Sequence, residues 1–194
     1  MKLYFAPGAC SLADHIALHE AGLRFEHERV DLKAKKTANG VDFGTINAKG
    51  YVPVLILDSG ETITENVAML DWIAQQAPAL SPPGAMGRTR LLEMLAYIST
   101  EIHKSFAPFF QGGSDAEKHK AADKLAMRFG WIAGQIQGDF LFGPSVSVAD
   151  CYLFVMVLWA AKNQIAVVPT LRDFNDRMKQ RPAVQLALTH EGLV

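Results

Sequence analysis

One stretch near the start of the chain, Tyr4 to Glu20, restricts the possible folds more than any other. The apolar run Leu3–Phe5 stops at Pro7-Gly8, a pair typical of turns, and Cys10 follows closely. Apolar residues then recur at the spacing expected of a helix, at Leu12, Ile16 and Leu18. The order of strand, turn, cysteine and helix predicts a thiol at the N-terminus of a helix.

The position of Cys10 suggests a reactive thiol. Unpaired backbone N–H groups and the positive end of the helix dipole stabilise a thiolate, so we expect its pKa to lie below the ordinary value. The chain continues Ser11-Leu12-Ala13 and has no second cysteine in the motif, which argues against a dithiol mechanism within it. A single thiol suits pairing with, or polarising, the thiol of a bound molecule. The alternative is a small buried apolar residue that follows a turn.

Composition excludes several classes of protein. The chain has 194 residues, with 19 Lys and Arg against 20 Asp and Glu, and no basic cluster that would indicate a nucleic-acid partner. Its only cysteines are Cys10 and Cys151, and no signal-like segment precedes the first strand. These features predict a cytoplasmic protein without disulfides. The most apolar run, Tyr152–Ala161, is about half of the ~20 residues that span a membrane, so no membrane association is expected.

The first 78 residues follow an α/β pattern. After the helix that ends near Gly22, the predicted elements are a strand at Phe25–Leu32, a loop with at most a short helix at Val41–Asn47, strands at Val54–Leu57 and Thr62–Thr64, and a helix from an N-cap at Asn66 to Pro78. The order is strand, helix, strand, then strand, strand, helix. This part is expected to form one domain, residues 1–78.

The remaining chain reads as helical. Breakers at Pro78 and Ser81–Gly84 indicate a linker at 79–86, followed by an all-α domain at 87–194. Ser147 and Asp150 form a capping-box variant at the start of a helix that is apolar on every side, which we expect at the domain's centre. Two apolar stripes predict further helices: Leu91, Leu95, Ile98 and Ile102, then Ala121, Leu125, Phe129, Ile132 and Ile136.

Several short motifs are spread along the chain in order: Met1–Tyr4 with Pro7–Leu12, Val30–Leu32 with Lys35-Lys36, Asn47–Pro53, Thr64-Glu65, Thr100–Lys104, Ser147–Asp150 and Arg181–Gln185. Each is weak alone, but together they resemble the bacterial, beta-class glutathione S-transferases over essentially the whole length. The resemblance implies a thioredoxin-like N-terminal domain of order βαβαββα, an all-α C-terminal domain, a homodimer, and glutathione as co-substrate.

The resemblance also implies which residues bind glutathione. The γ-glutamyl end of glutathione needs an anion and N–H donors, which Glu65 and the helix start at Asn66 would supply. The alternative is a helix cap that binds no ligand. The backbone of Val52 would pair with the middle residue of glutathione. The resemblance implies that the Val52–Pro53 peptide bond is cis, whereas the sequence alone favours a trans bond. The remaining binding candidates are Cys10, Ser11, Lys35, Thr100 and His103, with Lys35 and His103 at the glycine carboxylate and Cys10 and His103 also catalytic.

Two positions depart from the family pattern. Where this chain has Asn66, family members commonly have glycine or serine. Where it has Ala96, they often have an asparagine, which reaches the glutathione of the partner subunit. For a second substrate, a small hydrophobic electrophile, the candidates for an apolar wall are Phe106, Phe109 and Trp159, with Phe110 beside them. Plain core packing is the alternative for these aromatic residues.

No metal is expected from the sequence. His15 and His19 lie one helical turn apart but lack an HExxH pattern, so they are interpreted as ordinary helix residues, and Cys151 as structural. The predicted function is a detoxifying glutathione transferase that joins the glutathione thiolate to small apolar electrophiles. The alternatives are disulfide exchange through a mixed disulfide between Cys10 and glutathione, and a non-catalytic ligand-binding protein.

Overall fold

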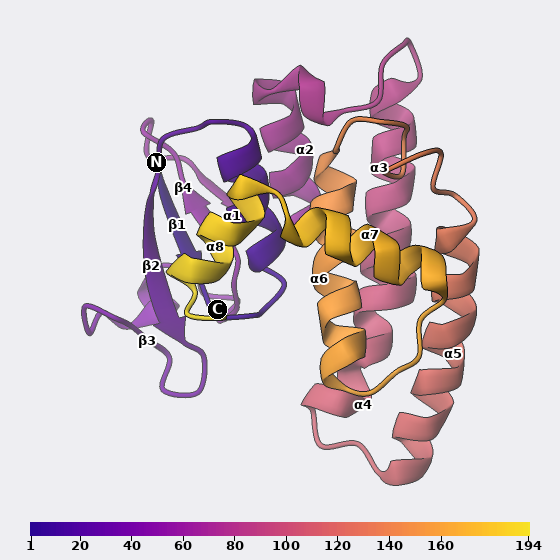
Figure 1. The fold of residues 1–194 in the computed structure, drawn as a ribbon. Helices are drawn as coiled ribbons and strands as arrows, with labels where there is room; N and C mark the ends of the chain where they lie inside the picture. Colours follow the sequence, from indigo (N-terminus) through magenta and orange to yellow (C-terminus); the bar gives the residue numbers. More distant parts are fainter.

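The computed structural model describes all 194 residues (Figure 1). Its N-terminal part is a five-stranded sheet of order β3-β2-β1-β4-β5, in which β1 is parallel to β2 and antiparallel to β4. The elements are β1 (Lys2–Phe5), α1 (Leu12–Glu20), β2 (Glu26–Asp31), β3 (Lys36–Thr37), β4 (Val54–Ile56), β5 (Thr62–Thr64) and α2 (Asn66–Gln76). The predicted thioredoxin-like arrangement is confirmed.

The central strand β1 divides the core of this part in two. Successive side chains of a strand point to opposite faces. Leu3 and Phe5 therefore pack into the large core that includes α1, while Tyr4 joins a smaller cluster on the other face with Phe43 and Val54. Burial on both sides explains why a strand of only four residues holds the centre of the sheet.

The segment between β2 and β4 contains more structure than the sequence indicated. The short strand β3 was not predicted, and the helix allowed at Val41–Asn47 is a single 3₁₀ turn at Phe43–Thr45, capped by Asp42. The cause is Phe43, which is fully buried against the Tyr4 ring and so anchors an otherwise polar loop.

The rest of the chain is helical, as predicted. It comprises α3 (Gly87–Tyr97), a π-helical turn (Ile98–Ile102), a 3₁₀ turn (His103–Phe106), α4 (Ala107–Phe110), α5 (Asp115–Ala133), α6 (Val148–Lys162), α7 (Pro169–Lys179) and α8 (Pro182–His190). The first apolar stripe is completely buried along its length, and the second is buried from Ala121 to Ile132. No helix is both long and apolar enough to cross a membrane.

The capping box at α6 is confirmed. Asp150 Oδ2 accepts from the Ser147 backbone N–H at 2.8 Å, and the Ser147 hydroxyl accepts from the Asp150 N–H at 3.4 Å. Asp150 Oδ1 also accepts from Leu141 N at 2.9 Å, so this carboxyl joins the preceding loop to the helix. Burial raises its pKa to about 6 despite these donors. The helix that it caps is the most enclosed in the molecule.

One continuous core joins the two parts of the chain. It runs from β1 and α1 through α6 to α8, and α8 returns at the end of the chain to pack on α1 (Figure 1). The C-terminal segment therefore stabilises the N-terminal part. The proposed division into residues 1–78, 79–86 and 87–194 stays a prediction.

Candidate functional site

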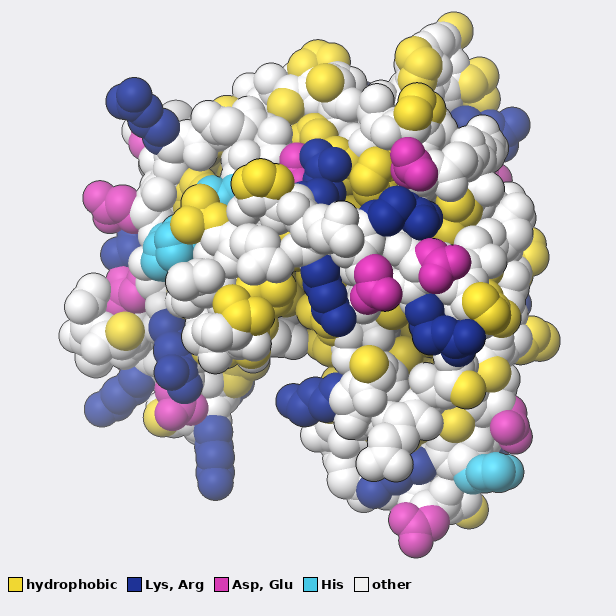
Figure 2. All heavy atoms as spheres, in the orientation of Figure 1, with side chains coloured by type: hydrophobic (Ala, Val, Ile, Leu, Met, Phe, Trp, Pro, Cys, Tyr) yellow, Lys and Arg dark blue, Asp and Glu magenta, His cyan; other side chains and the backbone are white.

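A cavity of about 510 Å³ lies where the start of α1, the loop before β4 and the start of α2 meet the helical part. Figure 2 shows the molecular surface hollowed between the sheet and the helices. The cavity brings together six of the residues selected from the sequence, namely Cys10, Val52, Pro53, Glu65, Asn66 and His103. Its other lining residues are Tyr51, Val67, Ser99, Lys104, Gln111 and Tyr152.

Cys10 lies in the turn just before α1, but its electrostatics differ from the prediction. Its thiol donates to the Val52 carbonyl oxygen at 3.7 Å. Burial, with a smaller contribution from the nearby Asp14 carboxyl, raises the pKa of Cys10 to about 12. The expected low pKa is therefore wrong for the ligand-free protein, because desolvation of a thiolate outweighs the helix N-terminus here. At neutral pH Cys10 is a thiol that can donate a hydrogen bond.

The neighbours of Cys10 hold its turn in place. The Val52–Pro53 peptide bond is cis, as the resemblance implied. Asn66 is the first residue of α2 rather than its N-cap, which is Glu65 with φ +68°. Instead of capping, the Asn66 amide donates to the Cys10 carbonyl oxygen at 2.9 Å. The residue that departs from the family pattern thus connects the starts of α1 and α2.

Glu65 presents a carboxylate at the cavity's edge. Its Oε1 accepts from Lys49 Nζ at 2.6 Å and from the Tyr51 hydroxyl at 2.7 Å. The hydrogen bond from Lys49, then that from Tyr51, holds the pKa of Glu65 below its ordinary value. The other oxygen, Oε2, has no partner within the protein and is free for a ligand. Lys49 and Tyr51 were not selected from the sequence, although both belong to the Asn47–Pro53 motif.

His103 faces the same cavity from the helical part. Its Nδ1 lies 2.6 Å from the Tyr152 hydroxyl on α6, a partner that sequence reasoning assigned to the core. Burial, and then the charge of Lys104, lowers the pKa of His103 to about 4. The ring is therefore neutral at neutral pH and cannot act as the cation expected for a carboxylate. Lys104, beside it, is the ammonium group that lines the cavity.

Three predicted binding residues do not line the cavity. Ser11 is fully buried, and its hydroxyl pairs with the backbone of Ala6. Lys35 Nζ donates to the Gly50 carbonyl at 2.7 Å, one residue from the lining Tyr51. The Thr100 hydroxyl, in the π-helical turn, donates to the carbonyl oxygen of Ala96 at the end of α3, at 3.0 Å. Local pairing occupies all three side chains.

The aromatic wall is arranged differently from the expectation. Phe106 is fully buried, and Trp159 is largely buried with its indole N–H donating to Gly8 O at 2.8 Å. Phe109 is half-buried and lines neither cavity described here. Phe110, half exposed, lines an adjoining hollow of about 440 Å³ with His103, Lys104, Ala107 and Gln111. Phe106 and Trp159 support that hollow from behind, since both rings pack against Phe110.

Comparison with known proteins matches both parts of the chain. Residues 9–76 match the family model described as glutathione S-transferase, N-terminal domain, and residues 100–189 match the C-terminal domain of the same name. The glutathione S-transferase GstA of Escherichia coli O157:H7 is 38% identical over 200 residues, covering 100% of both chains.

Solved structures agree with this match. A ternary complex of BphK, a bacterial GST, has a TM-score of 0.94 and 46% identity, covering 99% of this chain and 100% of that one. A sphingomonad glutathione S-transferase complexed with glutathione has a TM-score of 0.93 and 46% identity, covering 100% of both chains. The similarity therefore extends over the sheet, the helices and the cavity between them.

Proposed function

The chain belongs to the glutathione S-transferase family and is a glutathione transferase, and on this basis we propose how its cavity binds and activates glutathione. Residues 1–78 hold the tripeptide, residues 87–194 hold a small hydrophobic electrophile, and 79–86 connect them. The two substrates meet beside Cys10. The contact of the cavity with both the sheet and the helices supports this arrangement.

The γ-glutamyl end lies at the start of α2. Glu65 Oε2 accepts from the ligand's ammonium group, while Lys49 and Tyr51 hold Oε1 and keep the carboxylate ionised. Backbone N–H groups at the helix start, from Asn66 onward, bind the neighbouring carboxylate of the same residue. The backbone of Val52 pairs with the middle residue of the tripeptide.

The glycine carboxylate binds Lys35. In the ligand-free structure this ammonium has one carbonyl partner, Gly50 O, which a carboxylate replaces with a stronger, charge-assisted bond. His103, being neutral, contributes a hydrogen bond without a charge. Ser11 and Thr100 act through their backbone positions, since their side-chain hydroxyls are occupied.

Conjugation is the function that the site supports best, and the observation that carries it is the place of the Cys10 thiol on the cavity wall, where burial favours its protonated form. A neutral thiol donates a hydrogen bond to the sulfur of glutathione and stabilises the glutathione thiolate, whose proton passes to solvent. That thiolate attacks an electrophilic carbon and displaces the leaving group. A mixed disulfide requires Cys10 or glutathione to attack as a thiolate, and the raised pKa of Cys10 makes it the poorer nucleophile.

The experiment compares conjugation of glutathione to an aryl halide with reduction of a small glutathionylated disulfide. We expect the parent to favour conjugation, and Cys10→Ser, which keeps a donor, to retain more of it than Cys10→Ala. A parent that reduces the disulfide faster than it conjugates, with this reduction lost in both variants, would instead support the disulfide mechanism. Glutathione binding without turnover of either substrate would support a non-catalytic, ligand-binding protein.

We further propose a homodimer with a detoxifying role in the cytoplasm. Large apolar side chains remain exposed at Met86, before α3, and at Met127 and Trp131 on α5, which suits a surface covered by a second copy. Ala96 has no side-chain hydrogen bond to offer the partner's glutathione, so each site would rely on its own subunit. Light scattering on purified protein tests the dimer, and a monomeric mass would contradict it.

A further inference from the structure

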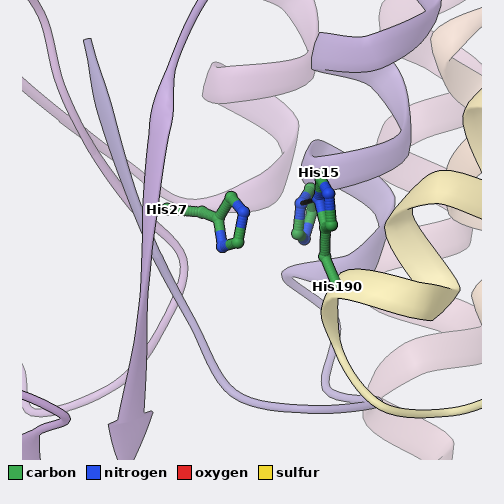
Figure 3. Close-up of side chains that lie close together, drawn as sticks. All are labelled: His15, His27 and His190. Carbon is green, nitrogen blue, oxygen red and sulfur yellow. Dashed lines mark hydrogen bonds between the residues drawn. The ribbon is translucent and has the colours of Figure 1, made fainter.

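Three histidines from distant parts of the sequence meet outside the glutathione cavity. His15 comes from α1, His27 from β2 and His190 from the end of α8, and Figure 3 shows their rings gathered between these elements. One ring nitrogen from each lies within 4.8 Å of the others. None of the three lines the cavity described above. The cluster is therefore a separate feature of the fold.

The spacing of two of these nitrogens matches that of metal ligands. His190 Nδ1 lies 3.4 Å from His15 Nε2. Zn–N bonds of ~2.0–2.1 Å in a tetrahedral site place two ligand atoms about 3.3–3.4 Å apart. The third ring, His27, is exposed and stacks on His190 with ring centroids 4.4 Å apart. An exposed side chain can rotate to complete the set without disturbing the core.

A buried carboxyl orients the ring at the centre of the cluster. His15 Nδ1 lies 3.0 Å from Glu191 Oε1, and both side chains are fully buried. Glu191 Oε2 is held in turn by the Gly8 backbone N–H at 2.8 Å. When Glu191 is ionised, His15 donates to it from Nδ1, and the lone pair of His15 Nε2 then faces His190 Nδ1. Metal-binding histidines are commonly oriented in this way by a carboxylate.

The cluster also contains a polar atom that the protein leaves unsatisfied. The ring of His19 stacks on that of His15, with centroids 5.2 Å apart, and its Nε2 is buried without a hydrogen-bond partner. Four imidazole rings thus lie together, and one of them, that of His15, is paired with a carboxyl. Such crowding is unusual in a helix packing surface, where buried polar groups are normally paired.

We propose that His15, His27 and His190 bind a divalent transition-metal ion, Zn²⁺ being the best match, with water at the fourth position. Three imidazole nitrogens and one open position suit zinc, whereas magnesium and calcium prefer oxygen ligands. The ion reaches the site from solvent, because His27 and His190 are exposed on the surface. Bound there, it joins the end of α8 to α1 and β2 and stabilises the return of the C-terminus. The sequence interpretation of His15 as an ordinary helix residue did not detect this, since its partners lie far along the chain.

The test uses full-length protein without a histidine tag, stripped of metal by a chelator. Titration with ZnCl₂ against a competing fluorescent chelator is expected to show one site per chain in the parent and in His119→Ala, a control at an exposed histidine on α5. His27→Ala and His190→Ala change exposed side chains, so both should fold and lose that site. Glu191→Gln should weaken zinc binding about 10- to 100-fold, as expected for a residue that orients a ligand.

Two further measurements separate this site from the thiols. With Co²⁺, the parent is expected to show visible bands of tetrahedral coordination without a sulfur-to-cobalt charge-transfer band. Added zinc is expected to raise the melting temperature of the parent and of His119→Ala, but not of His27→Ala. Zinc affinity equal in the parent, His27→Ala and His190→Ala, the absence of a saturable site, or a thiolate band that disappears in Cys10→Ser would overturn the proposal.

Discussion

The side-chain amide of Asn66 donates to the backbone carbonyl oxygen of Cys10 at 2.9 Å, and this bond joins the first residue of α2 to the turn that carries the thiol. Both residues line the same cavity, although 56 positions separate them in the sequence. Asn66 is also almost fully buried. Asn66 therefore has a structural role, holding the Cys10 turn, at a position where the family commonly has a smaller residue.

Asn66→Ala should lower both stability and glutathione affinity. Loss of a net hydrogen bond costs ~0.5–1.5 kcal/mol of unfolding free energy, and the released Cys10 turn should bind glutathione more weakly. Urea denaturation and calorimetry measure the two effects. Asn163→Ala is the matched control, because Asn163 also donates to a backbone carbonyl, Trp159 O at 2.8 Å, but lies away from the cavity. Equal glutathione affinity in the two variants would show that the Asn66 bond does not shape the site.

Cys10 in the ligand-free protein should be alkylated slowly at neutral pH. Its pKa is raised to about 12, so the thiolate fraction at pH 7–9 is below that of an unperturbed thiol with a pKa of ~8.5. Iodoacetamide labelling against pH, followed by mass spectrometry, measures this, and Cys151 should react more slowly still because it is fully buried. A labelling rate that reaches its plateau below pH 8 would disprove the raised pKa.

Glu65→Ala should weaken glutathione binding by ~1.5–3 kcal/mol, the contribution of a hydrogen bond to a charged group. The fold should persist because this side chain is about half exposed, at 51%. Calorimetry measures the affinity. Glu61→Ala, on the exposed turn before β5, is the control and should bind as the parent does. An unchanged affinity in Glu65→Ala would place the γ-glutamyl end elsewhere.

Asp150→Ala should destabilise the fold by ~0.5–2 kcal/mol through loss of the α6 cap, without changing the glutathione affinity of the folded protein. A lower melting temperature should accompany it. Glu117→Ala removes the corresponding, solvent-exposed capping box of α5 and should cost less, because no buried donors lose their partner. If Asp150→Ala melts like the parent but does not bind glutathione, Asp150 belongs to the site rather than to the scaffold.

His103 should make the protein less stable as the pH falls from about 6.5 to 4. Its folded pKa is about 4, below the ordinary 6.5, so the unfolded state takes up the proton first within this range. Above pH 6.5 both states are neutral and this effect is absent. The loss is up to about 1 kcal/mol per pH unit, and His103→Asn should reduce the slope of unfolding free energy against pH. An unchanged slope would mean that His103 titrates normally in the folded protein.

Elements that depend on neighbouring residues could be predicted from the sequence. The Ser147–Asp150 capping box and the stripe from Leu91 to Ile102 follow from side chains a few positions apart, and the structure contains both. Short elements were harder to predict. The β3 strand and the turn at Phe43 form because Phe43 packs against Tyr4, a contact between separate parts of the chain.

Much of the candidate site could be located as well, but not its charges. Cys10, Glu65 and His103 were selected from the sequence, and all three line one cavity. Their environments were not foreseen. Burial raises the pKa of Cys10, and hydrogen bonds from Lys49 and Tyr51 lower the pKa of Glu65. Burial, and then the charge of Lys104, lowers the pKa of His103 and keeps its ring neutral. A pKa depends on solvent exclusion and on charges within a few ångströms, which the order of residues does not specify.

The sequence by itself determined four of the five strands, the longer helices that have a clear apolar stripe or cap, where α6 begins, and that a lone cysteine precedes α1, because these depend on local propensity, capping and periodicity. Only the tertiary structure decided that Asn66 holds the Cys10 turn and that His15, His27, His190 and Glu191 meet. Those contacts exist because α2 and α8 pack on α1 around one shared core. Packing brings together side chains from both ends of the chain, and their chemistry depends on distance in space.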